Sequence, residues 1–354
     1  VLGKSNTPEM GAGGNTFNEV FGRTRTPWNT ALNAGGSSGG AAAALAAGEV
    51  WLAQGSDLGG SLRTPATYCG IVGLRPTPGR VSGGGGLNAY SHLGSDGPMA
   101  RNVEDCALFL DAMCGHDPVD PLTFDAPAVS FREALRRAAP PGRIAFSPDM
   151  GGLAPVEKDV RALHQAAMKR LSGLGVDVVE ADPPTDGLID AYNTLRAQAQ
   201  ATVAGMLPEA VTRHYKKTLR ENIAAGFALT IEDVIAAERG RSALLGKVSA
   251  FFRDYDAIAC PVVGIASQQA EIEYPTVVDG VELSHYMDWL KFAPFATVLG
   301  LPAVSVPIGF TANGAPMGIQ FIGRPRGEVG LLAVAKAMES VTEGFGKPID
   351  PAAG

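Results

Sequence analysis

The chain has 354 residues, a net charge of −7 at pH 7 and a mean hydropathy of +0.08. Because 45% of the residues are hydrophobic and only 18% are charged, the chain can bury a large core. The acidic balance argues against nucleic acid or a membrane surface as a partner, and no stretch is long and apolar enough to predict a transmembrane segment.

The cysteine and histidine patterns indicate neither a disulfide framework nor a metal site. Four cysteines lie in apolar surroundings without metal-type spacing: Cys69, Cys106, Cys114 and Cys260. They are typical of buried free thiols in a reducing compartment, so we expect a cytoplasmic protein. No H-E-x-x-H or other His/Cys cluster occurs, and we expect no metal and no other cofactor.

The first predicted elements, in chain order, alternate between helices and strands. Small residues predict a helix over 41–47, and apolar runs predict strands over 50–55 and 70–77. Asn102 is placed to cap a helix that ends before Gly115. The segment 127–142 is rich in charge and proline, which is typical of a surface connection.

The second half of the chain begins with a predicted βαβ unit. Two strand-like runs over 143–148 and 176–182 flank a helical pattern over 156–171, so the sheet is at least partly parallel. Residues 186–255 have a mostly helical pattern. Strands over 255–262 and 302–310 and a helix over 329–339 follow. We therefore predict one α/β domain over 1–354 with a helical excursion near its middle.

Two loops combine glycines with serines. "GGSSGG" sets Ser37 and Ser38 just before the alanine-rich helix, whose unpaired N–H groups favour a developing negative charge. In "GSDLGGSLR", Gly59 and Gly60 precede Ser61 and let successive N–H groups point one way, as in an oxyanion hole. Taken singly, each loop is more typical of an ordinary turn. No phosphate-binding glycine motif and no G-x-S-x-G is present.

The two loops together, with 24 residues between Ser37 and Ser61, resemble the amidase signature family. Its hydrolases cut amide and related acyl bonds with a Ser–cis-Ser–Lys triad. The resemblance extends to "LGKSNTPEMG", "GRTRTPWN", "GSDGPMARNVEDCALFLDAM", "DYDAIACPV" and "GLPAVSVPIGFTANGAPMGIQFIG". It is loose only over about 120–250. The implied fold is α/β, with a central mixed sheet flanked by helices on both faces.

The resemblance also implies a role for each loop. Ser61 matches the nucleophile, and Ser37 matches the serine that follows a cis peptide bond and relays the proton. The implied oxyanion hole consists of the N–H groups of Leu58, Gly59, Gly60 and Ser61. The residues expected to support the two loops are Ser38, through a hydrogen bond, and Asp57 and Arg63, through an ion pair.

The base of the family's triad is a lysine that lies well upstream of "LGKSN". The chain opens without Met, on Val1-Leu2 that resemble the end of a strand, so we expect the catalytic lysine in an upstream segment missing from this chain. Lys4 matches a different, non-catalytic family position. No histidine is expected to replace the lysine: His164 and His214 are predicted on solvated helix faces, His116 at a helix end, and His92 and His285 in loops near the cleft.

The sequence says least about which residues line the substrate pocket. We expect a helical substrate cap over about 186–250 and a pocket wall from the loop 274–295. The candidate lining residues are Met10, Phe17, His285, Tyr286, Met287, Trp289 and Phe292, with ordinary core packing as the alternative for them.

The expected substrate is a small hydrophobic or aryl amide, with carbamates, oligoamides and esters as further options. Two alternatives remain open. One is a glutaminase-type component of the tRNA-dependent amidotransferase, which needs partner subunits. The other is a non-catalytic scaffold that has kept the fold. A homodimer is also left open.

Overall fold

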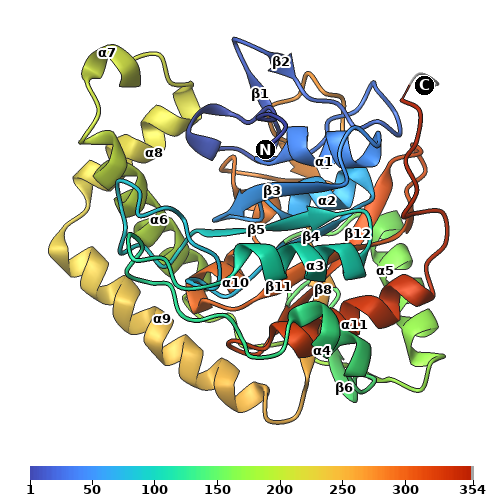
Figure 1. The fold of residues 1–354 in the computed structure, drawn as a ribbon. Helices are drawn as coiled ribbons and strands as arrows, with labels where there is room; N and C mark the ends of the chain where they lie inside the picture. The colour runs from blue at the N-terminus through green and yellow to red at the C-terminus, as the bar shows by residue number, and fades with distance from the viewer. Residues whose placement is uncertain (352–354) are drawn as a thin grey trace.

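The structure is a computed structural model that describes residues 1–351, and its centre is an eight-stranded mixed sheet (Figure 1). In spatial order the strands are β3 (Leu52–Asp57), β5 (Ser95–Ala100), β4 (Val72–Arg75), β11 (Ala303–Phe310), β12 (Pro316–Gly323), β8 (Ala257–Pro261), β6 (Arg143–Phe146) and β7 (Asp177–Glu180). β6 pairs in parallel with both β7 and β8, and the other neighbours are antiparallel. The predicted α/β class with a mixed sheet is confirmed.

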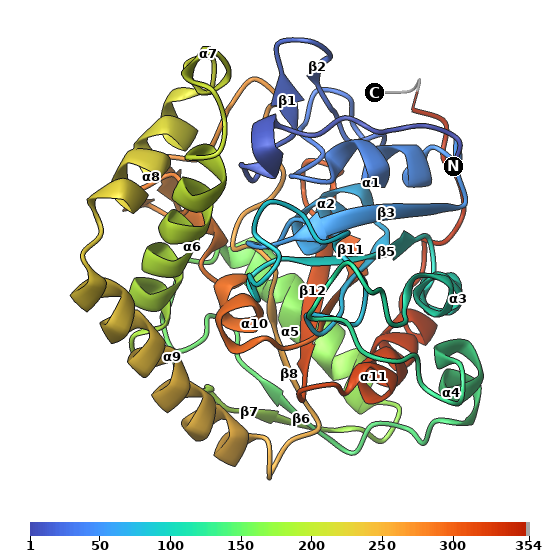
Figure 2. The same ribbon diagram turned by 60° about the vertical axis from the view of Figure 1, so that its left-hand side comes forward.

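Helices cover the sheet on both faces (Figure 2). The helices that pack against the strands or against one another around them are α1 (Gly39–Ala46), α2 (Arg63–Cys69), α3 (Val103–Met113), α4 (Phe131–Arg137), α5 (Lys158–Ser172) and α11 (Glu328–Ser340). The central strands β4, β8 and β12 are buried along their whole length, as strands covered on both faces must be.

The helical excursion forms a wall along one side of the sheet, clear in both views (Figures 1 and 2). It consists of α6 (Leu188–Ala204), α7 (Glu209–Thr212), α8 (Lys217–Ala228) and α9 (Ile231–Phe251), and we call it the helical wall. It contacts α10 (Pro294–Leu299). The remaining short elements are η1 (Glu9–Gly11), β1 (Phe17–Asn18), β2 (Gly22–Arg23), β9 (Val277–Val278), β10 (Val281–Glu282) and η2 (Asp288–Leu290).

Most predicted elements are present, and the main element that was not predicted is the helix α4. The parallel β6–α5–β7 unit is confirmed, as is the cap at Asn102, whose side chain accepts from the Asp105 N–H. The segment 127–142 is not only a surface connection, because it contains α4. Ser130 caps this helix through the N–H of Glu133, and Phe131 and Leu135 anchor it in the core.

The alanine-rich helix α1 lies unusually close to its neighbours. A Cβ added at Gly40 would lie 2.4 Å from the backbone nitrogen of Asn6, so only a glycine lets the two backbones approach this closely. The four cysteines are free thiols, and Cys69, Cys106 and Cys260 are buried, as expected. Within residues 1–351, no helix is both long enough and apolar enough to cross a membrane.

Candidate active site

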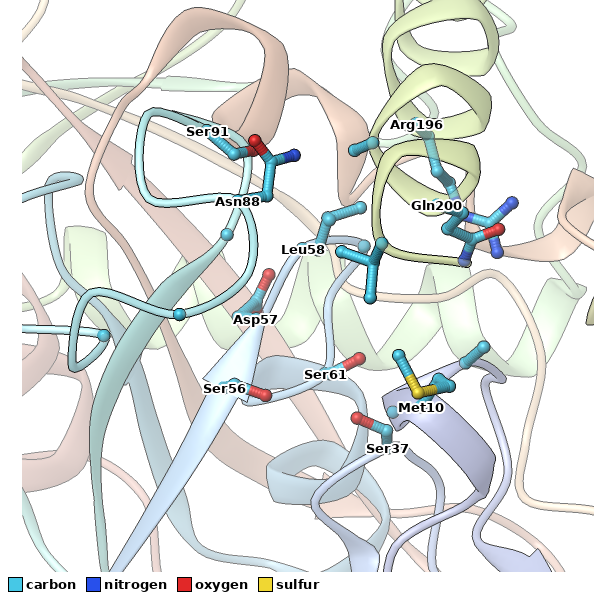
Figure 3. Close-up of a pocket in the computed structure, with 18 of the residues that line it drawn as sticks. Met10, Ser37, Ser56, Asp57, Leu58, Ser61, Asn88, Ser91, Arg196 and Gln200 are labelled. Atoms are coloured by element: carbon cyan, nitrogen blue, oxygen red, sulfur yellow. The ribbon is translucent and has the colours of Figure 1, made fainter. Parts of the chain in front are cut away.

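The two glycine–serine loops open on one cavity of about 370 Å3, and both Ser37 and Ser61 line it. Figure 3 shows the two side chains near one another at the base of the cavity, with Met10 beside Ser37. Met10, a predicted pocket residue, comes from η1 and lines this cavity. The opposite sides are formed by the loop that carries Asn88 and by α6 of the helical wall.

Ser37 follows a peptide bond, Gly36–Ser37, that is cis, as the resemblance implies. A Cβ added at Gly36 would come within 2.8 Å of the Asn15 backbone, so a larger residue has no room here. The Thr16 hydroxyl donates to the carbonyl oxygen of Gly35 or of Ser37, at 2.9 and 3.1 Å. The first loop is therefore held by backbone packing and by hydrogen bonds to its own carbonyls.

Ser38 ties the two loops together. Its N–H donates to the Ser61 carbonyl at 3.2 Å, and its hydroxyl contacts both the N–H and the carbonyl of Ser56, at 3.3 and 3.4 Å. The side chain therefore makes the supporting hydrogen bond that the sequence suggests. The positions of Ser37 and Ser61 are linked through this residue.

Asp57 is the electrostatic anchor of the second loop. Its carboxylate accepts from Arg63 through Nη2 at 2.8 Å and Nε at 3.0 Å, so the predicted ion pair is confirmed and is bidentate. Arg75 lies 3.5 Å from the same carboxylate and also donates to the Asp57 carbonyl. Burial alone would raise the pKa of Asp57, but Arg63, Arg75 and the Gly60 N–H hold it well below its ordinary value.

The same carboxylate determines which of the predicted oxyanion-hole N–H groups remain free to bind a ligand. It accepts from the Gly60 N–H at 2.9 Å, so this group is already engaged and is not free for a ligand. Within residues 1–351, the N–H groups of Leu58, Gly59 and Ser61 have no hydrogen-bond acceptor. All three residues line the cavity. The loop therefore presents three free N–H donors rather than four.

Of the residues expected from the loop 274–295, Met287 lines the cavity, and Leu290, which was not predicted, lines it as well. Tyr286, Trp289 and Phe292 are buried away from it, and His285 is exposed. The turn between Met287 and Leu290 is the 3-10 helix η2, in which residues three apart share a face. The sequence pattern of this loop does not indicate a helical turn of that pitch. Phe17 also lies outside the lining residues, with the Lys216 ammonium 4.8 Å from its ring.

The expectation that His164 lies on a solvated face is wrong. Its ring is fully buried where α5 packs on the sheet, with Nδ1 2.7 Å from the Val160 carbonyl and Nε2 3.2 Å from the Gly318 carbonyl. Burial lowers its pKa to about 4. The other histidines, His92, His116, His214 and His285, are exposed. Among the described residues, no three His, Cys, Asp or Glu side chains cluster as metal ligands would.

Three polar residues on the inner face of α6 were not predicted from the sequence. Tyr192, Arg196 and Gln200 follow one another at intervals of four and all line the cavity. The Tyr192 hydroxyl is buried without a hydrogen-bond partner and lies next to Gly59, whose added Cβ would be 2.4 Å from it. Burial raises the pKa of this phenol to about 12, so it is a proton donor at neutral pH. Their four-residue spacing, which places them on one face of a helix, is the sequence signal that could have identified them.

A cis bond before one serine, a second serine on a glycine loop and free N–H groups beside it define an amidase-signature site on a mixed α/β fold. The sequence model of the Amidase family matches residues 1–332, and the chain belongs to this family.

Named relatives within the family differ in what they do. The chain is 36% identical to a glutamyl-tRNA(Gln) amidotransferase subunit of Moorella thermoacetica, over 97% of this chain and 74% of that protein. It is 35% identical to an acylamidase of Rhodococcus erythropolis, over 96% and 72%. Sequence identity therefore does not separate the two activities.

Solved structures confirm the fold. A bacterial aryl acylamidase of the amidase signature family superposes with a TM-score of 0.88 at 27% identity, covering 96% of this chain and 72% of that one. A 6-aminohexanoate cyclic dimer hydrolase, complexed with substrate, superposes with a TM-score of 0.85 at 30% identity, covering 96% and 74%.

Proposed function

We propose that this protein hydrolyses amide C–N bonds through an acyl-enzyme on Ser61, with Ser37 as the proton relay. One observation supports this most directly: both hydroxyls line one cavity beside the unengaged N–H groups of Leu58, Gly59 and Ser61. Donors fixed in advance where negative charge develops are the strongest single contribution to acyl transfer, and losing one costs about 2.7–4 kcal/mol of barrier.

The proposed reaction has two halves. Ser37 takes the Ser61 proton as the Ser61 oxygen attacks the carbonyl carbon, and the free N–H groups hold the resulting anion. The C–N bond then breaks, Ser37 returns a proton to the nitrogen, and the amine leaves. Water attacks the ester by the same relay, which releases the acid and restores Ser61. The family's lysine would accept the Ser37 proton; none of the lysines in residues 1–351 lines the cavity.

A hydrophobic or aryl amide is the proposed substrate, with the helical wall as its cap. Much of the cavity is apolar, including Leu58, Val81, Leu122, Val203, Leu219 and Ile223. Such a surface favours apolar groups over fully polar ones. The named acylamidase relative and aryl acylamidase structure fit this choice. Carbamates and oligoamides belong in the same substrate panel, the latter because of the cyclic dimer hydrolase.

A glutaminase is the second candidate, because a relative 36% identical is named as part of an amidotransferase. The distinguishing assay is ammonia release from L-glutamine, with and without partner subunits. Release faster than hydrolysis of every aryl amide would favour this candidate.

The test of the main proposal compares matched serine variants in the full-length protein on a panel of p-nitroanilides, aryl amides and carbamates. Ser61→Ala should leave less than about one per cent of the activity and abolish labelling by a fluorophosphonate. Ser172→Ala, at an exposed position of α5, should match the wild type. Full activity of Ser61→Ala would refute the acyl-enzyme. Failure of the wild type to hydrolyse any substrate or to be labelled would favour a scaffold.

A further inference from the structure

Arg196 is a buried cation with no carboxylate partner in the described residues. Its side chain reaches the cavity from α6, the residue is 4% exposed, and none of the ion pairs formed within residues 1–351 includes it. Buried arginines are normally paired with an anion, because burying an isolated charge is costly. The cavity wall therefore has a positive charge that the protein does not neutralise.

The groups that hold Arg196 are neutral. Its Nη1 donates to the Asn222 side-chain oxygen at 2.6 Å, and its Nη2 donates to the Tyr286 hydroxyl at 2.5 Å. The guanidinium carbon also lies 5.5 Å from the centre of the Tyr286 ring. These contacts fix the orientation of the guanidinium and leave part of its five N–H donors free. Tyr286, which was expected to line the pocket, instead lies behind Arg196 and orients it.

Asn222 also orients a second hydrogen-bond donor of the cavity wall, the side chain of Gln200. Its amide nitrogen donates to the Gln200 side-chain oxygen. Because that oxygen is occupied, the Gln200 NH2 group is the end left to contact a ligand. Gln200 lies one helical turn after Arg196, and both line the cavity (Figure 3). This side of the cavity offers a cation and an amide donor close together.

The other charges that line the cavity do not compensate Arg196. Asp57 is paired with Arg63 and Arg75. Asp96 and Asp120 belong to the side formed by the loop 79–96: Asp96 accepts from Gln54, and Asp120 accepts from the Gly83 N–H. The serine pair lies between that loop and α6 (Figure 3). The cavity is thus acidic on one side and basic on the other.

We propose that the preferred substrate is an amide that carries a carboxylate, which Arg196 binds with help from Gln200. A planar guanidinium matches a carboxylate in geometry, and the pair is stronger where water is excluded. The inference rests on the proposed amidase function and narrows its substrate class. The apolar lining then contacts the chain or ring that joins the carboxylate to the scissile bond.

The kinetic test uses substrate pairs that differ only in the carboxylate, with the full-length protein. On the acyl side, glutaric acid mono-4-nitroanilide is compared with butyric acid 4-nitroanilide. On the amine side, 4-acetamidobenzoate is compared with acetanilide. The wild type should prefer the carboxylate in at least one pair. Arg196→Met should lower the kcat/KM ratio of that pair by about 10- to 100-fold, as expected for hydrogen bonds to a charged group.

Three variants separate binding from a structural role. Arg239→Met, at an exposed position of α9, should leave the ratio unchanged. Arg196→Lys should keep part of the preference, because the charge remains but the fork is lost. Gln200→Leu should lower the ratio less than Arg196→Met, and it replaces that variant if Arg196→Met does not fold. An equal loss on both members of a pair, or a wild-type preference for the neutral member, would overturn the inference.

A binding measurement covers the case in which the wild type hydrolyses nothing, which would contradict only the amidase function. Titration of glutarate and of 4-acetamidobenzoate into Ser61→Ala protein, followed by calorimetry, should show saturable binding of one of them. Arg196→Met added to that variant should remove the binding. If neither carboxylate binds, the proposed anion site does not exist.

Discussion

The serine loops and the helical wall meet at the same cavity but are built differently. The first loop is buried over 35–39, and the side chains of Asp57 and Arg63 that hold the second loop are inaccessible to solvent. In α9 of the wall only Ala237, Leu244 and Val248 are buried. The loops therefore owe their geometry to backbone contacts and a paired buried charge, whereas the wall lines the cavity with side chains of α6 and α8. The contrast suggests that reaction chemistry resides in the loops and substrate choice in the wall.

The largest expected difference between the two regions is kinetic. Ser37→Ala in the loops should lower kcat by about 10²- to 10⁴-fold, because it removes the proton relay. Ile223→Val on α8 of the wall removes one methylene from the cavity and should raise KM by up to about fourfold with kcat unchanged. Steady-state kinetics on one aryl amide measures both variants. A kcat effect of equal size from the wall variant would remove the proposed division of roles.

The next largest expected difference is in stability, between a buried ion pair of the loops and an exposed ion pair of the wall. Asp57→Asn should reduce the free energy of unfolding by about 3–5 kcal/mol, because it leaves Arg63 and Arg75 buried without their counter-ion. Asp186→Asn removes the exposed ion pair with Lys247 of α9, at 2.8 Å, and should not differ measurably from the wild type. Urea unfolding at pH 7 measures both, and similar losses would show that the loops do not depend on the buried pair.

The same pair has a predictable pH dependence. The folded protein lowers the pKa of Asp57, so the unfolded state binds this proton more readily. The stabilisation is complete above the ordinary value of 3.8 and is lost as the pH falls below it. The difference in the free energy of unfolding between wild type and Asp57→Asn should therefore shrink as the pH is lowered below about 4. A constant difference there would contradict the assignment.

Glycines give the smallest effects, of opposite sign in the two regions. Gly40→Ala in α1 should cost about 1–3 kcal/mol, since its Cβ would meet the Asn6 backbone at 2.4 Å. Gly246→Ala in α9 meets nothing within 4 Å and should stabilise by about 0.5–1 kcal/mol. Thermal unfolding of the two variants measures the contrast. Stabilisation by Gly40→Ala would show that α1 is free to move.

The sequence predicted the serine loops well because their geometry depends on local residue types. Glycines that permit close backbone approach, and a carboxylate six residues before an arginine, are visible in the letters themselves. The oxyanion donors were predicted less well. Sequence treats the N–H groups of Gly59 and Gly60 alike, but the Asp57 carboxylate occupies only the second.

The wall and its surroundings could not be predicted in this way, because their roles depend on which helix face meets the cavity. Arg196 and Gln200 lie 135 and 139 residues after Ser61, and the only local signal for them is the four-residue spacing of polar residues along α6. His164 shows the reverse case: charged neighbours in sequence suggested solvent, but the turn of α5 points the ring inward against Gly318. In the loop 274–295, an unpredicted 3-10 turn changed which residues face the substrate.

The hydrogen bond from the Ser38 N–H to the Ser61 carbonyl has a consequence for divergence within the fold. Ser38 immediately precedes α1 and Ser61 lies two residues before α2, so the spacing of the two serine loops depends on how these two short helices pack together. The side chains of α8 that line the cavity take no part in this hydrogen bond, so a substitution there can reshape the cavity while the two loops stay joined.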